Sequence, residues 1–195
     1  MTRIYILNGH PAETSLSKAL SLAYARSAEA NGHEVRISHL FDLDFDADYG
    51  FAGYRETKPL EPDLEGFMAN LEWCEHFVLS TPMWWGGLPG KLKGLFDRAL
   101  LPGTAFDPRN PNMIGMPAPL LKGRSSRVFV TSDTPGWAFS MFYKKAMPRQ
   151  IKDQILGFVG LKPVKTTLLA PASHPKPKTV ARWLSQAETL AAKAA

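Results

Sequence analysis

Five short runs of β-type residues recur at long intervals along the chain, and each is followed by a segment with helical spacing. The strand candidates are residues 3–7, 34–40, 76–81, 127–132 and 164–170, and the helix candidates are residues 15–31, 63–73, 88–101, 138–158 and 178–193. Alternation with helices of this length implies parallel strands joined by right-handed crossovers. The pattern therefore predicts an α/β protein of three layers, with one parallel sheet and helices on both of its faces.

The number of strands narrows the topology. Five strands in a doubly wound sheet favour the flavodoxin-like order 2-1-3-4-5. The chain of 195 residues is expected to form one domain over residues 1–195. Residues 41–62 and 102–124 fit no regular element, and loops of this length in a compact domain are usually functional or partner-facing.

Composition excludes several classes of protein. Cys74 is the single cysteine, so no internal disulfide forms, and a reducing cytoplasm with a structural thiol is expected. No apolar run approaches a signal-peptide core or a membrane span. The net charge of +5 is spread among interleaved acids and bases, which disfavours nucleic acid and favours phosphorylated cofactors as partners. The alternating carboxylates at 42–48 lack the glycine and distal glutamate of a calcium loop, so no metal site is expected.

Ligands of such sheets bind beyond the carboxyl ends of the strands, at the point where strand order reverses. The loop after the first strand places His10, Thr14, Ser15 and Ser17 directly before a helix. A helix N-terminus offers free N–H groups and the positive end of a dipole, so this loop is predicted to hold a phosphate. The alternative is that Thr14 or Ser15 only caps the helix.

The loop after the third strand carries two adjacent tryptophans on a turn rich in proline and glycine. Trp84 and Trp85, with outward-pointing N–H groups on residues 83–85, suit a flat heteroaromatic ring. The alternative is packing under the next helix or an oligomer contact. The loop after the fourth strand, with Thr131, Ser132, Asp133 and Thr134, is a candidate wall for the same ring or an ordinary turn. Fingerprints of Rossmann dehydrogenases, P-loop NTPases, α/β-hydrolases and zinc enzymes are absent from the sequence.

These residues resemble a known family. Residues 81–106, TPMWWGGLPGKLKGLFDRALLPGTAF, are similar to the Pro-x-x-Trp, Leu-Lys-Gly and Gly-x-Ala-Phe/Tyr pattern of the flavodoxin-like NAD(P)H:quinone oxidoreductases, a group that includes drug-activity modulator and potassium-efflux ancillary flavoproteins. The resemblance implies a flavin, FMN or FAD, reduced by NAD(P)H. It implies that the phosphate is held by His10, Ser15, Leu16 and Ser17, and that the ring is contacted by Pro82, Met83, Trp84, Trp85, Ser132, Asp133 and Thr134.

The sequence also departs from that family. Many members have Thr-Thr-Gly-Gly where this chain has Asp133-Thr134-Pro135-Gly136, and proline supplies no amide donor. The catalytic Tyr and His of mammalian-type members are not matched, although Tyr143 lies nearby, so no catalytic side chain is assigned.

The expected activity is two-electron, ping-pong reduction of quinones or similar aromatic acceptors, with Phe106 and Trp137 as further walls of the acceptor pocket. By resemblance, a homodimer is expected. A regulatory subunit of a membrane transporter and a flavodoxin-type electron carrier are the alternatives.

Overall fold

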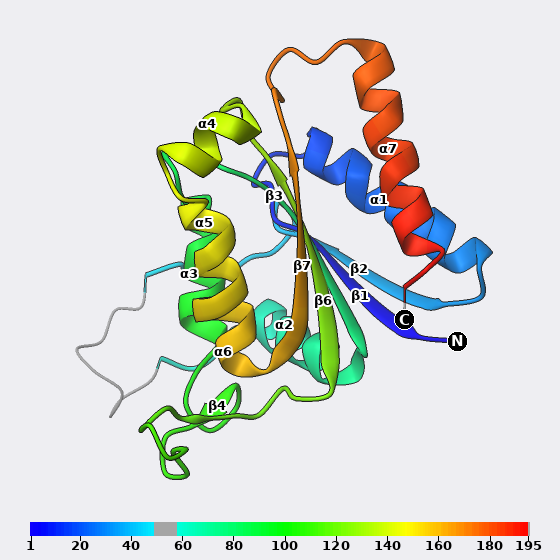
Figure 1. Ribbon diagram of the computed structural model, residues 1–195. Coiled ribbons are helices and arrows are strands. Elements are labelled where there is room, and N and C mark those ends of the chain that lie inside the picture. Colours follow the sequence, from blue (N-terminus) through cyan, green and yellow to red (C-terminus); the bar gives the residue numbers. More distant parts are fainter. Residues whose placement is uncertain (49–57, 195) are drawn as a thin grey trace.

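The computed structural model describes residues 1–48 and 58–194. Its main sheet contains five parallel strands, β1 (Arg3–Asn8), β2 (Glu34–His39), β3 (His76–Pro82), β6 (Arg124–Thr131) and β7 (Leu161–Leu169). The strand order is β2-β1-β3-β6-β7, which confirms the predicted flavodoxin-like topology. The carboxyl ends of these strands share the edge of the sheet that faces α4 in Figure 1.

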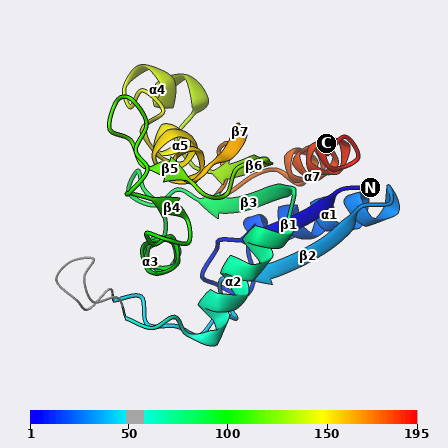
Figure 2. The ribbon, with the colours of Figure 1, turned by 90° about the horizontal axis from the view of Figure 1, so that it is seen from below.

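Helices cover both faces of this sheet. Helices α1 (Leu16–Ala30) and α7 (Pro177–Ala191) lie on one face, whereas α2 (Pro62–Trp73) and α3 (Gly90–Ala99) lie on the other, as Figure 2 shows. The alternation of side chains along β1 divides the core accordingly. Ile4 and Ile6 pack in the cluster under α1 and α7, while Tyr5 and Leu7 pack in the cluster under α2 and α3.

The predicted helix over 138–158 is wrong as a single element. The chain forms α4 (Gly136–Met141), then α5 (Ala146–Arg149), the π-helix η1 (Gln150–Leu156) and α6 (Gly157–Val159). Lys144 and Lys145 both have positive φ, at 48° and 53°, and this ends the first piece. At Gly157 a Cβ atom would lie 2.2 Å from the Lys152 carbonyl oxygen, so only glycine permits the wide π turn there.

Residues 102–124 are mostly irregular, as expected, but they include a short antiparallel pair. Strand β4 (Phe106–Asp107) pairs with β5 (Ala118–Pro119). Asp107 accepts hydrogen bonds from the side chains of Arg109 and Asn110, and the Arg109 contact is the first cause that lowers its pKa to about 2. This hairpin lies at the end of the sheet opposite α4 (Figure 1).

The segment 41–48 lies against α3 and is referred to below as the strap. Lys91 Nζ donates to the Leu43 carbonyl at 2.6 Å, and at Gly94 a Cβ atom would lie 2.6 Å from that of Ala47. The strap therefore needs a residue without a side chain at position 94.

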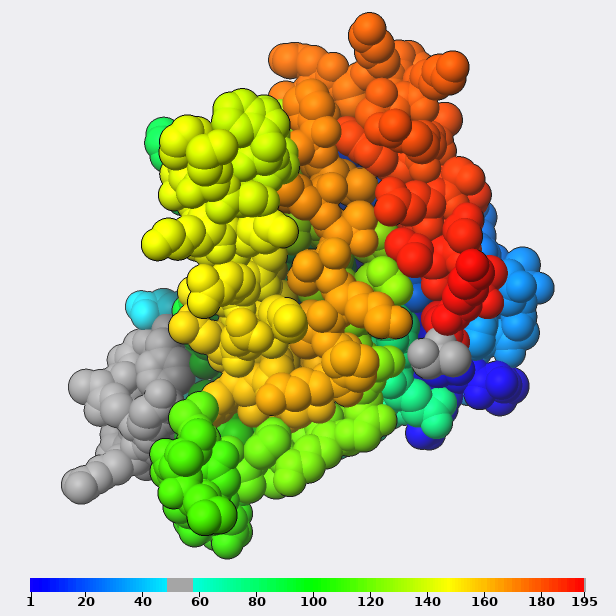
Figure 3. Space-filling view, viewed as in Figure 1, coloured from blue at the N-terminus to red at the C-terminus, as the bar shows by residue number. Residues whose placement is uncertain are grey.

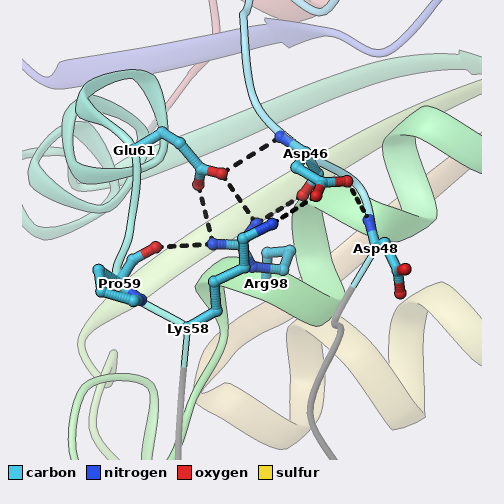
Figure 4. Close-up of polar contacts among 6 residues, drawn as sticks. All are labelled: Asp46, Asp48, Lys58, Pro59, Glu61 and Arg98. Atoms are coloured by element: carbon cyan, nitrogen blue, oxygen red, sulfur yellow. Dashed lines mark hydrogen bonds and ion pairs between the residues drawn. The ribbon is translucent and has the colours of Figure 1, made fainter.

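One turn further along α3, Arg98 donates to the carbonyls of Asp46 and Pro59 (Figure 4). Its guanidinium also forms a bidentate ion pair with the Glu61 carboxylate. Asp46 also pairs with Lys58. Arg98 thus joins both sides of the loop, whose residues 49–57 lie outside the described part of the chain. Among the described residues, no group of three or more His, Cys, Asp or Glu side chains is arranged to hold a metal.

Two remaining features are the absence of a membrane-spanning helix among the described residues and the environment of Cys74. No helix within residues 1–48 and 58–194 has the length and apolarity needed to cross a bilayer.

Cys74 is buried at the end of α2, where burial raises the pKa of its thiol to about 11 and its Sγ donates to the Leu71 carbonyl. An un-ionised, buried thiol fits the structural role expected of it.

Candidate functional site

An open pocket of about 220 Å³ lies where the loops after β1, β3 and β6 meet. This is the switch point between β1 and β3 at which the sequence placed the ligand. The predicted site residues that line it are His10, Ser15, Leu16, Ser17, Pro82, Met83, Trp84, Ser132 and Asp133. Trp85, Thr134, Phe106 and Trp137 are not part of its wall.

One side of the pocket is the first turn of α1. Ser15 is the N-cap and its Oγ accepts from the Lys18 amide at 3.0 Å, so Ser15 does cap the helix, while phosphate binding by this loop stays a prediction. The amides of Leu16 and Ser17 have no partner within the helix. Ser17 is fully buried, and its Oγ has no hydrogen-bond partner among the described residues. Unpaired donors and no acidic residue in the first turn make this cradle suitable for an anion.

His10 stands beside the cradle in a fixed orientation. Its backbone N–H donates to Asn8 Oδ1 at 3.2 Å, and its ring Nδ1 accepts from the Ala12 amide at 3.0 Å. Because Nδ1 is the acceptor, the proton of the neutral ring is on Nε2, which is left to donate. Partial burial lowers the pKa of His10, so the neutral form prevails at neutral pH. Its ring meets Trp84 edge-on, with centroids 5.5 Å apart.

The second side of the pocket is the tryptophan turn, residues 84–87. Trp84 and Gly87 exchange backbone hydrogen bonds of 3.0 and 2.9 Å, and Trp85 occupies the turn with φ of 51°. Trp84 lines the pocket, whereas the Trp85 side chain is fully exposed. The expectation that residues 83–85 present free amides is wrong for two of them, because Met83 N–H donates to the Thr131 carbonyl and Trp84 N–H donates to Gly87.

The third side is the loop after β6, which is fastened to the loop after β7. Asp133 accepts from the amides of Ala172 and Ser173 at 3.0 and 2.7 Å and from the Ser173 hydroxyl. The Ser173 contacts are the first causes that lower the pKa of Asp133. Asp133 therefore lines the pocket and also joins two loops, and these hydrogen bonds from Ala172 and Ser173 are referred to below as the clasp. The backbone amide of Thr134 is paired within its own loop, since it donates to Ser132 Oγ at 3.1 Å.

Sequence reasoning did not assign Ala172 and Ser173 to the site, although both line the pocket. The position of these residues in the sequence could have indicated that they belong to the site. Their loop follows the fifth strand, whose carboxyl end lies next to that of β6 at the same sheet edge. Thr14 and Thr131 also line the pocket.

Phe106 and Trp137, which were expected to form further walls of the acceptor pocket, do not line it. Phe106 packs on Phe158 with ring centroids 5.1 Å apart, at the end of the sheet opposite α4. Trp137 is 65% exposed and meets the edge of Phe142, while Tyr143 is 60% exposed beside Phe139. Within one chain, therefore, Phe106 and Trp137 do not form the pocket.

The fold and the pocket together define a class: a doubly wound α/β protein with an anion cradle at the first helix and an aromatic wall at the switch point. The family model described as flavodoxin-like fold matches residues 2–191, and the chain belongs to this flavodoxin-like family.

Curated relatives and solved structures agree with that placement. The chain is 27% identical over 196 residues to the FMN-dependent NADH:quinone oxidoreductase of Nitratidesulfovibrio vulgaris (strain DP4). The matched residues cover 91% of this chain and 90% of the relative. It superposes on the NAD(P)H:quinone oxidoreductase from Methanothermobacter marburgensis with a TM-score of 0.79 at 20% identity, over 98% of this chain and 96% of that one. An FMN-dependent NADH-azoreductase from Bacillus anthracis in complex with FMN gives a TM-score of 0.72 at 17% identity, over 99% of each chain. The two solved structures bear on the fold alone.

Proposed function

We propose that this protein is an FMN-dependent NAD(P)H:quinone oxidoreductase. The observation that carries the proposal is that one pocket contains both an anion cradle with an orphaned buried hydroxyl, Ser17 Oγ, and an aromatic wall, Trp84. A flavin mononucleotide needs both, one for its phosphate and one for its ring. The name of the relative from Nitratidesulfovibrio vulgaris supports the same cofactor and reaction class.

The residues of the pocket divide the work of binding. The amides of Leu16 and Ser17, the hydroxyl of Ser17 and Nε2–H of His10 donate to the phosphate, and the helix dipole adds to their attraction. Trp84 gives the ring a flat apolar neighbour. When bound, FMN supplies the chemistry, because it takes up two electrons with a hydride from NAD(P)H and passes them to a quinone.

The acceptor side of the pocket is open in one chain, and this supports a homodimer. Among the described residues, four aromatic side chains from the tryptophan turn and the segment 137–143 are more than half exposed, and such rings are usual at protein interfaces but not on a free surface. These are Trp85, Trp137, Phe142 and Tyr143. A two-fold partner covering Trp85, Trp137 and Phe142 would close the pocket and allow a distant residue such as Phe106 to reach a site in the other copy. We place the enzyme in the cytoplasm, consistent with a buried, unpaired Cys74.

The test is an absorbance spectrum of the purified protein between about 300 and 550 nm, followed by anaerobic addition of NADPH or NADH and then of a quinone. Flavin bands that bleach with the nucleotide and return with the quinone are the expected result, and the released cofactor should be FMN. A colourless protein that neither FMN nor FAD reconstitutes would refute the proposal. A stable one-electron intermediate with little NAD(P)H oxidation would identify a carrier instead.

The clasp at Asp133 gives a prediction about cofactor affinity. Asp133→Ala should raise the dissociation constant for FMN about tenfold, because three hydrogen bonds that hold the loop at 172–173 against the pocket are lost. Fluorescence titration of the apoprotein with FMN measures it. Asp97→Ala, which removes an exposed carboxylate on α3, is the matched control and should leave FMN affinity unchanged. Equal affinities for both variants would show that the clasp does not shape the pocket.

The same clasp predicts a pH dependence. The pKa of Asp133 is lower in the folded protein than in the unfolded chain, so the folded state binds this proton less readily. Its contribution to stability is thus complete above the ordinary aspartate range and is lost as the pH falls through the lowered folded pKa. We expect the thermal midpoint of the wild type to fall over that acidic interval more steeply than that of Asp133→Ala. Parallel pH profiles from differential scanning calorimetry would contradict this.

A further inference from the structure

A second open groove, of about 590 Å³, lies on the other side of the tryptophan turn. Gly86 of that turn lines one side, and Tyr143, Lys144 and Arg149 line the other. This part of the chain includes α4, which forms a protruding knob in the yellow-green part of Figure 3. Lys144, with positive φ, belongs to the connection between α4 and α5.

The groove carries basic side chains that pair with no carboxylate of the described residues. Lys144 and Arg149 are exposed, and none of the ion pairs between described residues involves either of them. Asp153 is the one carboxylate in the groove wall of the described chain, against these two cations. A partly enclosed surface of this kind attracts an anion and concentrates it near the wall.

The groove and the flavin pocket share one structural element. Trp84 lines the pocket and Gly86 lines the groove, and the two residues belong to the same tight turn, closed by the hydrogen bonds between Trp84 and Gly87. A ligand whose flat ring lies over the pocket at Trp84 can therefore extend past the turn and place an anionic tail in the groove.

We propose that Lys144 and Arg149 in this groove bind the phosphates of the pyridine dinucleotide whose nicotinamide reacts at the neighbouring pocket. The inference rests on the proposed function, since it names the site for the hydride donor of that reaction. The guanidinium of Arg149 is suited to two parallel hydrogen bonds with phosphate oxygens, and Lys144 acts as a point charge. Because both side chains are solvent-exposed, the attraction should weaken with ionic strength.

The test compares two kinds of hydride donor on the FMN-loaded enzyme, with and without phosphates. NADH and NADPH carry the phosphates, whereas dihydronicotinamide riboside has the same reacting ring without any phosphate. In the double variant Lys144→Gln/Arg149→Gln, the KM for NADH and NADPH should rise at least about tenfold, while the KM and kcat for the riboside stay within about twofold of wild type. The wild-type KM for the dinucleotides should also rise with salt, and that for the riboside should not.

The matched control removes the same number of charges elsewhere. Arg26→Gln/Arg182→Gln lies on exposed positions of α1 and α7, in the helical layer on the far face of the sheet, and should leave the KM of every donor unchanged. Circular dichroism and FMN content establish that each variant is folded and loaded. An equal rise of KM for the dinucleotides and the riboside, no rise for either, or an equal rise in the control would overturn the inference. Failure of all donors to reduce the bound flavin of the wild type would instead refute the proposed function.

Discussion

Replacing Arg98 with leucine is expected to lower the free energy of unfolding by about 3 kcal/mol, the largest stability effect that we anticipate from one side chain outside the apolar core. The Arg98 side chain is 1% exposed and pairs with Glu61 at 2.8 Å. It also donates to the carbonyls of Asp46 and Pro59, on either side of the loop (Figure 4). The leucine leaves all of these acceptors without their buried donor.

Denaturant unfolding followed by circular dichroism measures this loss. Lys93→Ala is the matched control on the same helix, because Lys93 forms an exposed pair with Asp97 and should cost no more than about 0.5 kcal/mol. The double variant Arg98→Leu/Glu61→Leu should be more stable than Arg98→Leu alone, since it removes the unpaired carboxylate. If Arg98→Leu lowered the free energy of unfolding no more than Lys93→Ala does, the link that Arg98 makes between the strap and residues 59–61 would contribute nothing to folding.

The fold could be predicted because its signal is local. Runs such as 3–7 and 76–81 are apolar on both faces, as strands buried between two helical layers must be, and the intervening segments have helical period. The anion cradle followed from the same logic. Strand order places the loop after β1 at the switch point, so that Ser15, the N-cap of α1, and Ser17, in its first turn, lie where a ligand is expected.

What the sequence did not reveal depends on contacts between distant segments. Asp133 has the composition of an ordinary turn residue, and its partner Ser173 is 40 positions away in the chain. The amides of Met83 and Trp84 exist in any sequence, but only the register of β3 on β6 and the closure of the turn assign them acceptors. Likewise, helical periodicity continues through 138–158 and carries no sign of the left-handed pair Lys144 and Lys145.

Phe106 illustrates a further limit. Its motif places it 21 residues after Trp85 in the sequence, but α3 runs the length of the sheet between them and carries Phe106 to the opposite end. Nearness in a family motif is therefore no evidence for nearness in one chain. The proposed dimer offers a way to reconcile the two.

Introducing a carboxylate into the anion cradle should abolish tight FMN binding. In Ser17→Asp, the new negative charge lies among the donors proposed for the phosphate, so the dissociation constant for FMN should rise at least about a hundredfold, or about 2.7 kcal/mol. Ser17→Ala removes only one hydroxyl donor and should raise it about fivefold to tenfold. Titration of the apoproteins by flavin fluorescence compares the three forms.

Riboflavin separates loss of the phosphate contact from damage to the pocket. It has the same ring and no phosphate, so its weaker binding should be nearly equal in wild type, Ser17→Ala and Ser17→Asp. Ser17 is fully buried, so the aspartate costs some stability, although a negative charge at the second residue of α1 interacts favourably with the helix dipole and with free amides. Circular dichroism establishes that each variant is folded, and unchanged riboflavin binding then separates loss of the phosphate contact from misfolding. If Ser17→Asp bound FMN as tightly as wild type, the phosphate would have to be held elsewhere, and the cradle at α1 would lose its assigned role.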